Sequence, residues 1–306
     1  MAGRTSRLTA VAPVVALAFA LTAVGCSGGT TDPASEDGGP RRVGVLAPAA
    51  AEMLDALGLD DRVVGVGEFG PWPAPLRALP TIGGYDTPNA ERVLELRCDA
   101  VITTRSEAAL DAHRRLEALG VRVVALDTAT FDGVFDALAE IGRLFDRGNR
   151  ADELAARMRR ELDDLAARAA SAEPRRVLVV VGRDPLYVAG PGSYLDELVR
   201  RAGGINVAGD PGSPYRRISV EAILERAPEV IVDTSDNTPG AVFGRRPGRW
   251  ARWDTLPAVA EDRVYHVHPG RLAIPGIRLP EMAQLMGRLI HPEIFGAPTD
   301  AALGPP

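Results

Sequence analysis

Histidines are the residues of this chain best suited to binding a metal or moving a proton, and they are few. His266 and His268 alternate along the sequence, so both imidazoles would lie on one face of a strand. His113 and His291 are the only other histidines, which is too few for a zinc site of the usual ligand count. We therefore predict solvent-facing strand histidines at 266 and 268, and no metal site.

Three glycines in residues 65–70 have the G-x-G-x-x-G spacing of a dinucleotide-binding loop. Such a loop requires a helix directly after it, because the helix N-terminus receives the pyrophosphate. Residues 71–75 contain three prolines, which are incompatible with the interior of that helix. The glycine spacing therefore does not predict a nucleotide site.

Acidic residues offer no clear catalytic centre either. Glu91 and Glu95 lie about one helical turn apart, as many solvated helix acids do. The sequence contains no P-loop and no H-E-x-x-H motif. We predict no catalytic residues, and a secreted hydrolase or metalloenzyme is the alternative from a different functional class.

Aromatic side chains on loops rich in proline and glycine are better candidates for a function. They are Phe69, Trp72 and Tyr85 in the first half of the chain, and Tyr187 and Tyr215 in the second. Flat apolar surfaces of this kind suit the face of a corrin, a porphyrin or a catechol. We predict these five residues as ligand-binding, with packing of their own loops as the alternative.

Arginines gather in the second half of an otherwise acidic protein, at positions 216, 217, 245, 246, 249 and 271. A guanidinium group can bind a carboxylate or phosphate through two parallel hydrogen bonds. Most of these side chains are expected to be solvated. We select Arg216 and Arg271 as ligand-binding candidates.

An internal repeat indicates how these residues are positioned. Residues 89–104 read NAERVLELRCDAVITT, and residues 219–234 read SVEAILERAPEVIVDT. At this offset Glu91 matches Glu221, and both halves predict a short helix, a turn and a buried apolar strand. Two similar lobes would therefore present two carboxylates symmetrically, although an acid at a helix N-terminus is also favoured by the helix dipole.

The alternation of strands and helices predicts an α/β fold with two three-layer, parallel-sheet lobes. The lobes are expected at residues 41–130 and 175–296, with residues 297–306 as a tail. Residues 131–174 should connect them. Within this connection, the 20 residues 152–171 have one apolar helical face and would span roughly 30 Å, so the linker should be a long rigid interdomain helix.

The N-terminus has the layout of an export signal. Arg4 and Arg7 precede an apolar stretch that ends in small residues before Cys26. This resembles a lipobox, so we predict a signal peptide at 1–25, lipidation of Cys26 and a flexible tether at 26–40. An ordinary signal peptide or an uncleaved membrane anchor is the alternative.

Charge narrows the choice of partners. Removal of residues 1–25 would delete two arginines and change the formal net charge from −6 to −8. An acidic body argues against nucleic-acid binding. Cys98 is the only other cysteine, so we expect the fold to be stable without a disulfide.

Longer stretches of the chain resemble one family, the substrate-binding lipoproteins of ABC importers for cobalamin, ferric siderophores and haem. The resemblance lies in residues 41–67, 81–102, 179–209, 215–232, 256–268 and 288–296. The chain departs from the family pattern at Ala47-Pro48, where Ser-Pro is usual, and at Cys98, where proline is usual. It also lacks an arginine that is common near residues 274–278, so we carry over no anion contact to that turn.

The resemblance implies a binding protein with no cofactor of its own, located outside the cytoplasmic membrane and held there by a lipid anchor only. The expected ligand is a small metal chelate, with a corrinoid as the leading choice and a ferric siderophore or haem as alternatives. Tyr187, Tyr215 and the loop around Tyr85 would face this ligand. Glu91 and Glu221 would dock onto the permease dimer, which works with its ATPase subunits, and the receptor would be a monomer.

Overall fold

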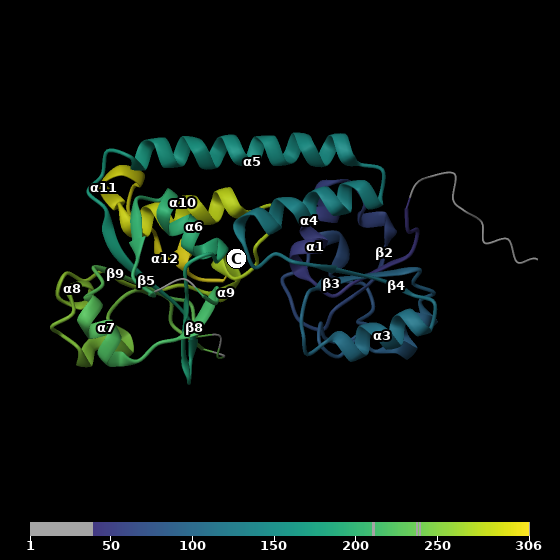
Figure 1. Ribbon diagram of the computed structural model, residues 1–306, viewed down its shortest axis with the longest axis horizontal. Coiled ribbons are helices and arrows are strands. Elements are labelled where there is room, and N and C mark those ends of the chain that lie inside the picture. Colours follow the sequence, from purple (N-terminus) through teal and green to yellow (C-terminus); the bar gives the residue numbers. More distant parts are fainter. Residues whose placement is uncertain (1–38, 210–211, 237, 239, 306) are drawn as a thin grey trace, which may run out of the picture. The chain divides into compact units, whose positions relative to one another are not determined.

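The computed structural model describes residues 39–305 apart from 210–211, 237 and 239, and Figure 1 shows its helices and strands. The described residues belong to one compact unit. The predicted signal peptide, the predicted lipidation site Cys26 and most of the predicted tether lie outside the described residues.

Among the described residues, four strands, all parallel, form the first sheet in the order β2-β1-β3-β4. They are β1 (Val43–Val45), β2 (Val63–Val66), β3 (Ala100–Thr104) and β4 (Arg122–Leu126). The helical elements of this lobe are α1 (Pro48–Ala56), η1 (Asp60–Arg62), η2 (Ala74–Leu76), α2 (Ala90–Glu95) and α3 (Leu110–Ala118). The alternating pattern of the sequence is therefore confirmed as a parallel sheet with crossover connections.

Within the part of the chain that the structure describes, the second sheet has seven strands, ordered β10-β11-β9-β5-β6-β8, with β7 paired to β5. They are β5 (Arg175–Arg183), β6 (Leu186–Ala189), β7 (Gly204–Asn206), β8 (Tyr215–Arg217), β9 (Val230–Asp233), β10 (Gly244–Arg245) and β11 (Val264–His266). The pairs β5/β7, β5/β9 and β9/β11 are parallel, as expected. The pairs β5/β6, β6/β8 and β10/β11 are antiparallel. The β5/β6 pair is antiparallel because only two residues separate its strands, which suffices for a hairpin and not for a parallel crossover.

The helical elements of the second lobe cover both faces of this sheet. They are α6 (Tyr194–Arg201), α7 (Val220–Arg226), η3 (Gly248–Arg252), α8 (Pro257–Ala260), α9 (Pro269–Leu272), α10 (Leu279–Ile290), α11 (Pro292–Phe295) and α12 (Asp300–Leu303). Leu303 of α12 is fully buried. The segment predicted as a tail therefore contains a short helix that packs on the second lobe.

Two helices, not one, occupy the predicted connection: α4 (Phe131–Leu144) and the longer α5 (Gly148–Ala169). Asp146, between them, has a left-handed backbone conformation that separates the two helices. The apolar face of α5 includes Leu154, Met158 and Leu162, all buried as predicted. This face packs on α4, α6 and α10, and Figure 1 shows α5 running alongside them.

Apolar clusters among the described residues pack the helices on both faces of each sheet. The largest runs from β1 and α1 through α4 and α5 to α6 and α10. A second cluster, including Val93, Val101 and Leu116, fills the space between the first sheet and α2 and α3. A third, including Ile223 and Ile231, lies between the second sheet and α7. Each sheet is therefore covered on both faces, which is why its central strands read as continuous apolar runs.

The two copies of the internal repeat have the same helix cap and the same turn. Asn89 caps α2 by accepting a hydrogen bond from the amide of Arg92, and Ser219 caps α7 by accepting one from the amide of Ala222. The residue three positions before β3, Arg97, has φ of 50°, and its counterpart Ala227 has φ of 43°. Both helices therefore stop at a left-handed residue before their strand begins.

An acidic residue two positions after each left-handed residue binds the backbone at the start of a neighbouring strand in the sheet, β1 or β5. Asp99 accepts hydrogen bonds from the amides of Arg41 (2.8 Å) and Arg42 (3.1 Å). Glu229 accepts one from the amide of Arg176 (2.9 Å). In both copies the same arginine also donates from Nε to a carbonyl near the helix end, at Leu96 (2.9 Å) or Ala227 (3.0 Å).

No helix among the described residues is long and apolar enough to cross a membrane. Cys98 is a buried free cysteine, and burial raises the pKa of its thiol to about 11. The thiol is therefore protonated and unreactive at neutral pH.

Candidate ligand-binding site

A cavity of about 290 Å³ opens where strands of the first sheet end and the second lobe begins. Its lining comes from the first lobe at Ala47, Pro48, Ala49, Thr104, Arg105, Asp127, Thr128 and Ala129, and from the second lobe at Tyr194, Tyr215, Ala273, Ile274 and Pro275. The first-lobe residues follow the carboxyl ends of β1, β3 and β4 or form those ends. This is the position where open parallel sheets place their ligands.

A second cavity of about 290 Å³ adjoins the first and shares Tyr194, Tyr215 and Ala273 with it. Its other lining residues are Val181, Leu195, Thr234, Ser235, Pro269 and Leu272. Val181 and Thr234 lie towards the carboxyl ends of β5 and β9, which are neighbours in the second sheet. We call the two cavities together the cleft.

Tyr194 and Tyr215 lie at the centre of the cleft. The Tyr194 hydroxyl donates a hydrogen bond to the carbonyl of Leu272 (2.7 Å), and its backbone amide donates one to Ala129 (3.1 Å). Burial raises the pKa of Tyr215 to about 12 and that of Tyr194 well above its ordinary value. Both phenols are therefore neutral at physiological pH and offer hydroxyl groups beside aromatic rings.

Sequence reasoning selected Tyr215 and missed Tyr194. Tyr194 begins α6 directly after the Gly190–Ser193 loop, and Ser193 caps the helix by accepting a hydrogen bond from the amide of Asp196. The sequence did contain a signal for Tyr194: it is an aromatic residue at the start of a helix, directly after a loop rich in glycine and proline. Loops of this kind that follow strands lie at the sheet edge where ligands bind.

The walls of the cleft carry little charge. Among the described residues that line it, Arg105 and Asp127 are the charged pair, with Nη1 and Oδ2 3.3 Å apart and both side chains exposed. The other lining residues are apolar side chains, hydroxyl groups and prolines. Such a site can hold a ligand by shape, aromatic contact and neutral hydrogen bonds.

The aromatic residues predicted in the first lobe do not line the cleft. Phe69 and Tyr85 are 76% and 52% exposed. The Tyr85 loop is fixed to the loop after β3, because the Ser106 hydroxyl donates to Asp86 (2.6 Å), and Asp86 raises the pKa of Tyr85. Trp72 is only 9% exposed, packs in the core and lines a different cavity.

Tyr187 and Arg216 lie on the β6/β8 pair of the second lobe. The Tyr187 hydroxyl accepts a hydrogen bond from Nε of Arg217 (3.2 Å), whose guanidinium also lies over the tyrosine ring. Arg216 stands opposite Val188 in the sheet. Neither Tyr187 nor Arg216 is among the lining residues of the cleft.

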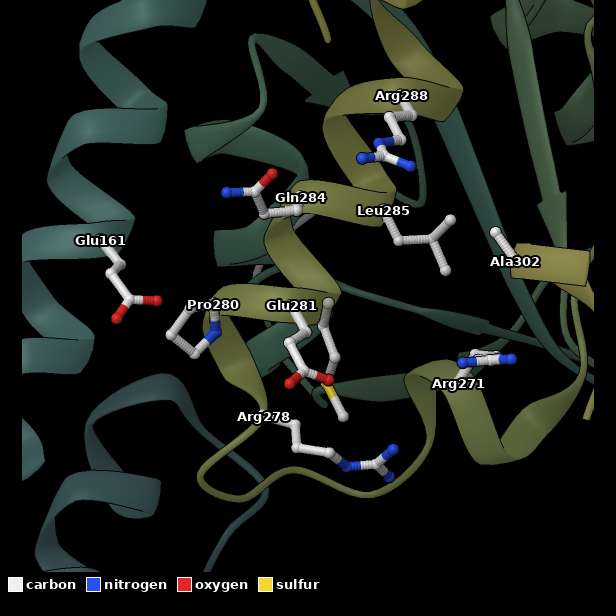
Figure 2. Close-up of a pocket in the computed structure, with 10 residues that line it drawn as sticks. Glu161, Arg271, Arg278, Pro280, Glu281, Gln284, Leu285, Arg288 and Ala302 are labelled. Atoms are coloured by element: carbon white, nitrogen blue, oxygen red, sulfur yellow. The ribbon is translucent and has the colours of Figure 1, made fainter. Parts of the chain in front are cut away.

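Arg271 is placed away from the cleft and holds the C-terminal segment. Its guanidinium donates to the carbonyls of Gly304 (3.0 Å), Ala301 (3.1 Å) and Pro305 (2.9 Å). Figure 2 shows Arg271 at one side of a cavity of about 340 Å³, opposite Glu281 and Arg288 of α10. The contacts of Arg271 are thus with the chain itself, which the composition of its loop does not reveal.

The prediction that His266 faces solvent is wrong. His266 is buried, because β11 lies between β9 and β10 and because Gly248 of η3 packs against the imidazole. Burial lowers its pKa. His268 is half-buried and caps α9, where Nδ1 accepts a hydrogen bond from the amide of Gly270 (3.0 Å). The described residues contain no cluster of three or more potential metal ligands.

Glu91 and Glu221 occupy matching places at the first turns of α2 and α7, and both are exposed. One turn further along, Leu94 and Leu224 are exposed large apolar residues. The structure therefore presents the same acid and the same leucine on both copies of the repeat.

Comparison with known proteins identifies the family. A family model described as periplasmic binding protein matches residues 43–270. The uncharacterized ABC transporter substrate-binding lipoprotein YvrC of Bacillus subtilis is 29% identical over 263 residues, which cover 84% of this chain and 82% of YvrC.

Two solved structures are similar to this chain over most of its length. The periplasmic vitamin B12 binding protein BtuF of Vibrio cholerae has a TM-score of 0.68 and 25% identity, covering 82% of this chain and 96% of BtuF. A periplasmic heme binding protein from Pseudomonas aeruginosa has a TM-score of 0.66 and 28% identity, covering 83% of this chain and 94% of that protein. The chain belongs to the periplasmic binding protein family, as a substrate-binding protein of the ABC-transporter type.

Proposed function

We propose that this protein captures a corrinoid in the cleft around Tyr194 and Tyr215 and delivers it to an ABC permease. The observation that carries the choice of ligand is the nearly uncharged lining of the cleft, where Arg105 is already paired with Asp127. A corrinoid surrounds its ring with neutral amides. Haem propionates and the carboxylates of acidic siderophores would require unpaired cations in the walls.

The tyrosines also favour a corrinoid over haem. A phenol coordinates haem iron as an oxygen ligand, whereas the Tyr194 hydroxyl already donates to Leu272. Burial raises the pKa of both Tyr194 and Tyr215, which opposes the formation of a phenolate. Haem remains the second candidate, because the similar Pseudomonas aeruginosa protein binds heme.

In this proposal the two cavities, of about 290 Å³ each, receive one edge of the corrin ring. Binding therefore includes a widening of the cleft, or leaves part of the ligand outside it. Phe69 and Tyr85, both exposed on loops of the first lobe, provide aromatic surface for that outer part. Tyr187, Arg216, Trp72 and Arg271 support the fold in this proposal, through the contacts described above.

The docking role of Glu91 and Glu221 is part of the same proposal. Two exposed carboxylates on equivalent helices match a partner that presents the same basic site twice, as a permease dimer does. Charge pairs of this kind mainly steer association and set orientation. The receptor would be a monomer held by a lipid on Cys26, and it would carry no resident cofactor and catalyse no reaction.

Gel filtration of the purified full chain with cyanocobalamin, with a ferric hydroxamate and with haemin tests the ligand. We expect cyanocobalamin to co-elute in a one-to-one complex and to be recovered unchanged. Retention of haemin or of the siderophore alone would overturn the corrinoid assignment. Chemical turnover of a retained compound that is lost with one Asp, Glu or His substitution would favour the enzyme alternative.

A further inference from the structure

One shielded ion pair joins the two lobes beside the cleft. Glu52 lies on α1 of the first lobe, and Arg278 directly precedes α10 of the second. Oε1 of Glu52 and Nε of Arg278 are 2.9 Å apart, and the side chains are only 12% and 22% exposed. The Nε group is not aligned as a hydrogen-bond donor, so the contact is mainly one of charge. A pair shielded in this way is screened much less than a surface pair.

Arg278 also closes the loop that forms one wall of the cleft. Its Nη2 donates a hydrogen bond to the carbonyl of Gly270 (3.2 Å). Residues 270–278 are therefore tied end to end by one side chain. The middle of this loop, Ala273–Pro275, lines the cleft opposite Pro48 and Ala49 at the start of α1.

The loop and α1 are in close contact at the ion pair. A methyl group added at Gly276 would lie 3.4 Å from Cβ of Ala49 and 3.5 Å from Oε2 of Glu52, which is ordinary contact distance. A larger side chain at Gly276 would push the two apart. The width of the cleft at this point is therefore set by how firmly the loop is held against α1.

A cavity of about 390 Å³ lies on the other side of the pair. It is lined by Pro71, Trp72, Pro73, Ile277 and the charged residues Glu52, Asp55, Arg77, Arg278 and Glu281. The pKa of Glu52 is raised overall. Burial is the largest cause, the carboxylates of Glu281 and Asp55 raise it further, and Arg278 lowers it. Oε2 of Glu52 is buried without a hydrogen-bond partner. Among the described residues, Arg278 is the group of this lining that forms an ion pair with Glu52, so its loss would leave a buried carboxylate uncompensated.

We propose that Glu52 and Arg278 are positioning residues that hold the Ala273–Pro275 wall against the start of α1 and so set the width of the ligand cleft. The proposal rests on the proposed function only in assigning the cleft to the ligand. Without Arg278 the loop loses both of its ties, and without the Glu52 charge it loses the tie to α1. The wall then moves more freely and a bound ligand escapes faster.

Amide hydrogen exchange of residues 270–278 in the ligand-free chain measures the wall directly. Glu52→Gln and Arg278→Met should each accelerate exchange in this loop by on the order of ten-fold, because local opening becomes easier by the same factor. Arg278→Lys retains the positive charge but loses the guanidinium that contacts Glu52 and the Gly270 carbonyl at once. It should therefore accelerate exchange less than Arg278→Met. Asp262→Asn is the matched control, because it removes an exposed ion pair with Arg245 (3.2 Å) elsewhere in the second lobe.

The release rate of cyanocobalamin supplies the functional measurement. We expect release from Glu52→Gln to be about ten-fold faster than from the unmodified chain, with little change in Asp262→Asn. If Arg278→Met fails to fold, Glu52→Gln and Arg278→Lys still decide the matter. Exchange in residues 270–278 that is unchanged, or that rises equally in Asp262→Asn, would overturn the proposal. If the unmodified chain does not bind cyanocobalamin, the corrinoid assignment fails, while the exchange measurement still tests the ion pair.

Discussion

The segments α2–β3 and α7–β9 are two copies of one unit placed in different sheets. Both begin with a capping side chain, turn at a left-handed residue and use an acidic residue to bind the backbone at the start of a neighbouring strand of the sheet. β3 lies between β1 and β4 in a parallel sheet, whereas β9 lies between β5 and β11 in a mixed one. The unit is thus specified by its own residues and tolerates different neighbours.

The copies differ most in the two residues that directly precede β3 and β9. Cys98 is buried in the first copy, and its counterpart Pro228 in the second accepts a hydrogen bond from the amide of Ala258, beside α8. Asp99 binds two backbone amides, whereas Glu229 binds one and also pairs with the Arg176 side chain at 3.5 Å. The first copy therefore depends more on backbone capping, and the second more on side-chain contacts. Substitutions of the acids that both copies share should therefore affect function, and substitutions of the residues that differ between the copies should affect stability.

The largest effect is expected from reversing the shared acids. The double substitution Glu91→Arg and Glu221→Arg should reduce uptake in cells by more than about ten-fold, because like charges would meet at the permease. Each single reversal should reduce uptake less. The measurement is transport of labelled ligand, with ligand affinity of the purified variant measured in parallel.

Glu140→Arg provides the control, since Glu140 is an exposed acid on α4 and outside both copies. Uptake that survives the double reversal would show that the symmetry of the two acids has no role in docking. Loss of ligand affinity in the double variant would place the acids in the binding site instead.

A smaller effect is expected on stability when the acid after the left-handed residue is removed from each copy. Asp99→Ala should lower the free energy of unfolding by about 1–2 kcal/mol and Glu229→Ala by about 1 kcal/mol, because the first leaves two amides without their acceptor and the second leaves one. Urea unfolding of both variants measures the difference. Equal losses would mean that the Arg176–Glu229 ion pair compensates for the missing second amide.

The smallest effect is expected at the left-handed residues. Replacing Arg97 or Ala227 with glycine should raise the free energy of unfolding by about 0.5 kcal/mol, because relief of the left-handed strain exceeds the added entropy of the unfolded chain. Ala222→Gly, inside α7, should lower it by about 0.5–1 kcal/mol. Thermal unfolding distinguishes the two signs, and destabilisation by Ala227→Gly would contradict the strain assigned to that residue.

Much of the fold could be predicted because it depends on local patterns. The repeat at 89–104 and 219–234, the buried face of α5 and the parallel first sheet all follow from periodicity and capping residues that lie close together in the chain. The antiparallel strands of the second lobe and the break between α4 and α5 were missed. The β5–β6 hairpin and the break between α4 and α5 each depend on a turn of only two or three residues, which a periodicity of ten or more residues does not resolve.

The sequence by itself determined the family, the two lobes and the matching acids Glu91 and Glu221, since each is written in residues that are neighbours along the chain. Only the tertiary structure decided what lines the cleft. It brought Tyr194 together with Tyr215, turned Arg271 towards the C-terminal carbonyls, buried His266 and paired Glu52 with Arg278 across the lobes. The physical reason is that a side chain's partner is set by which strands and helices become neighbours in space, and residues 52 and 278 carry no mark of their contact until both lobes have folded.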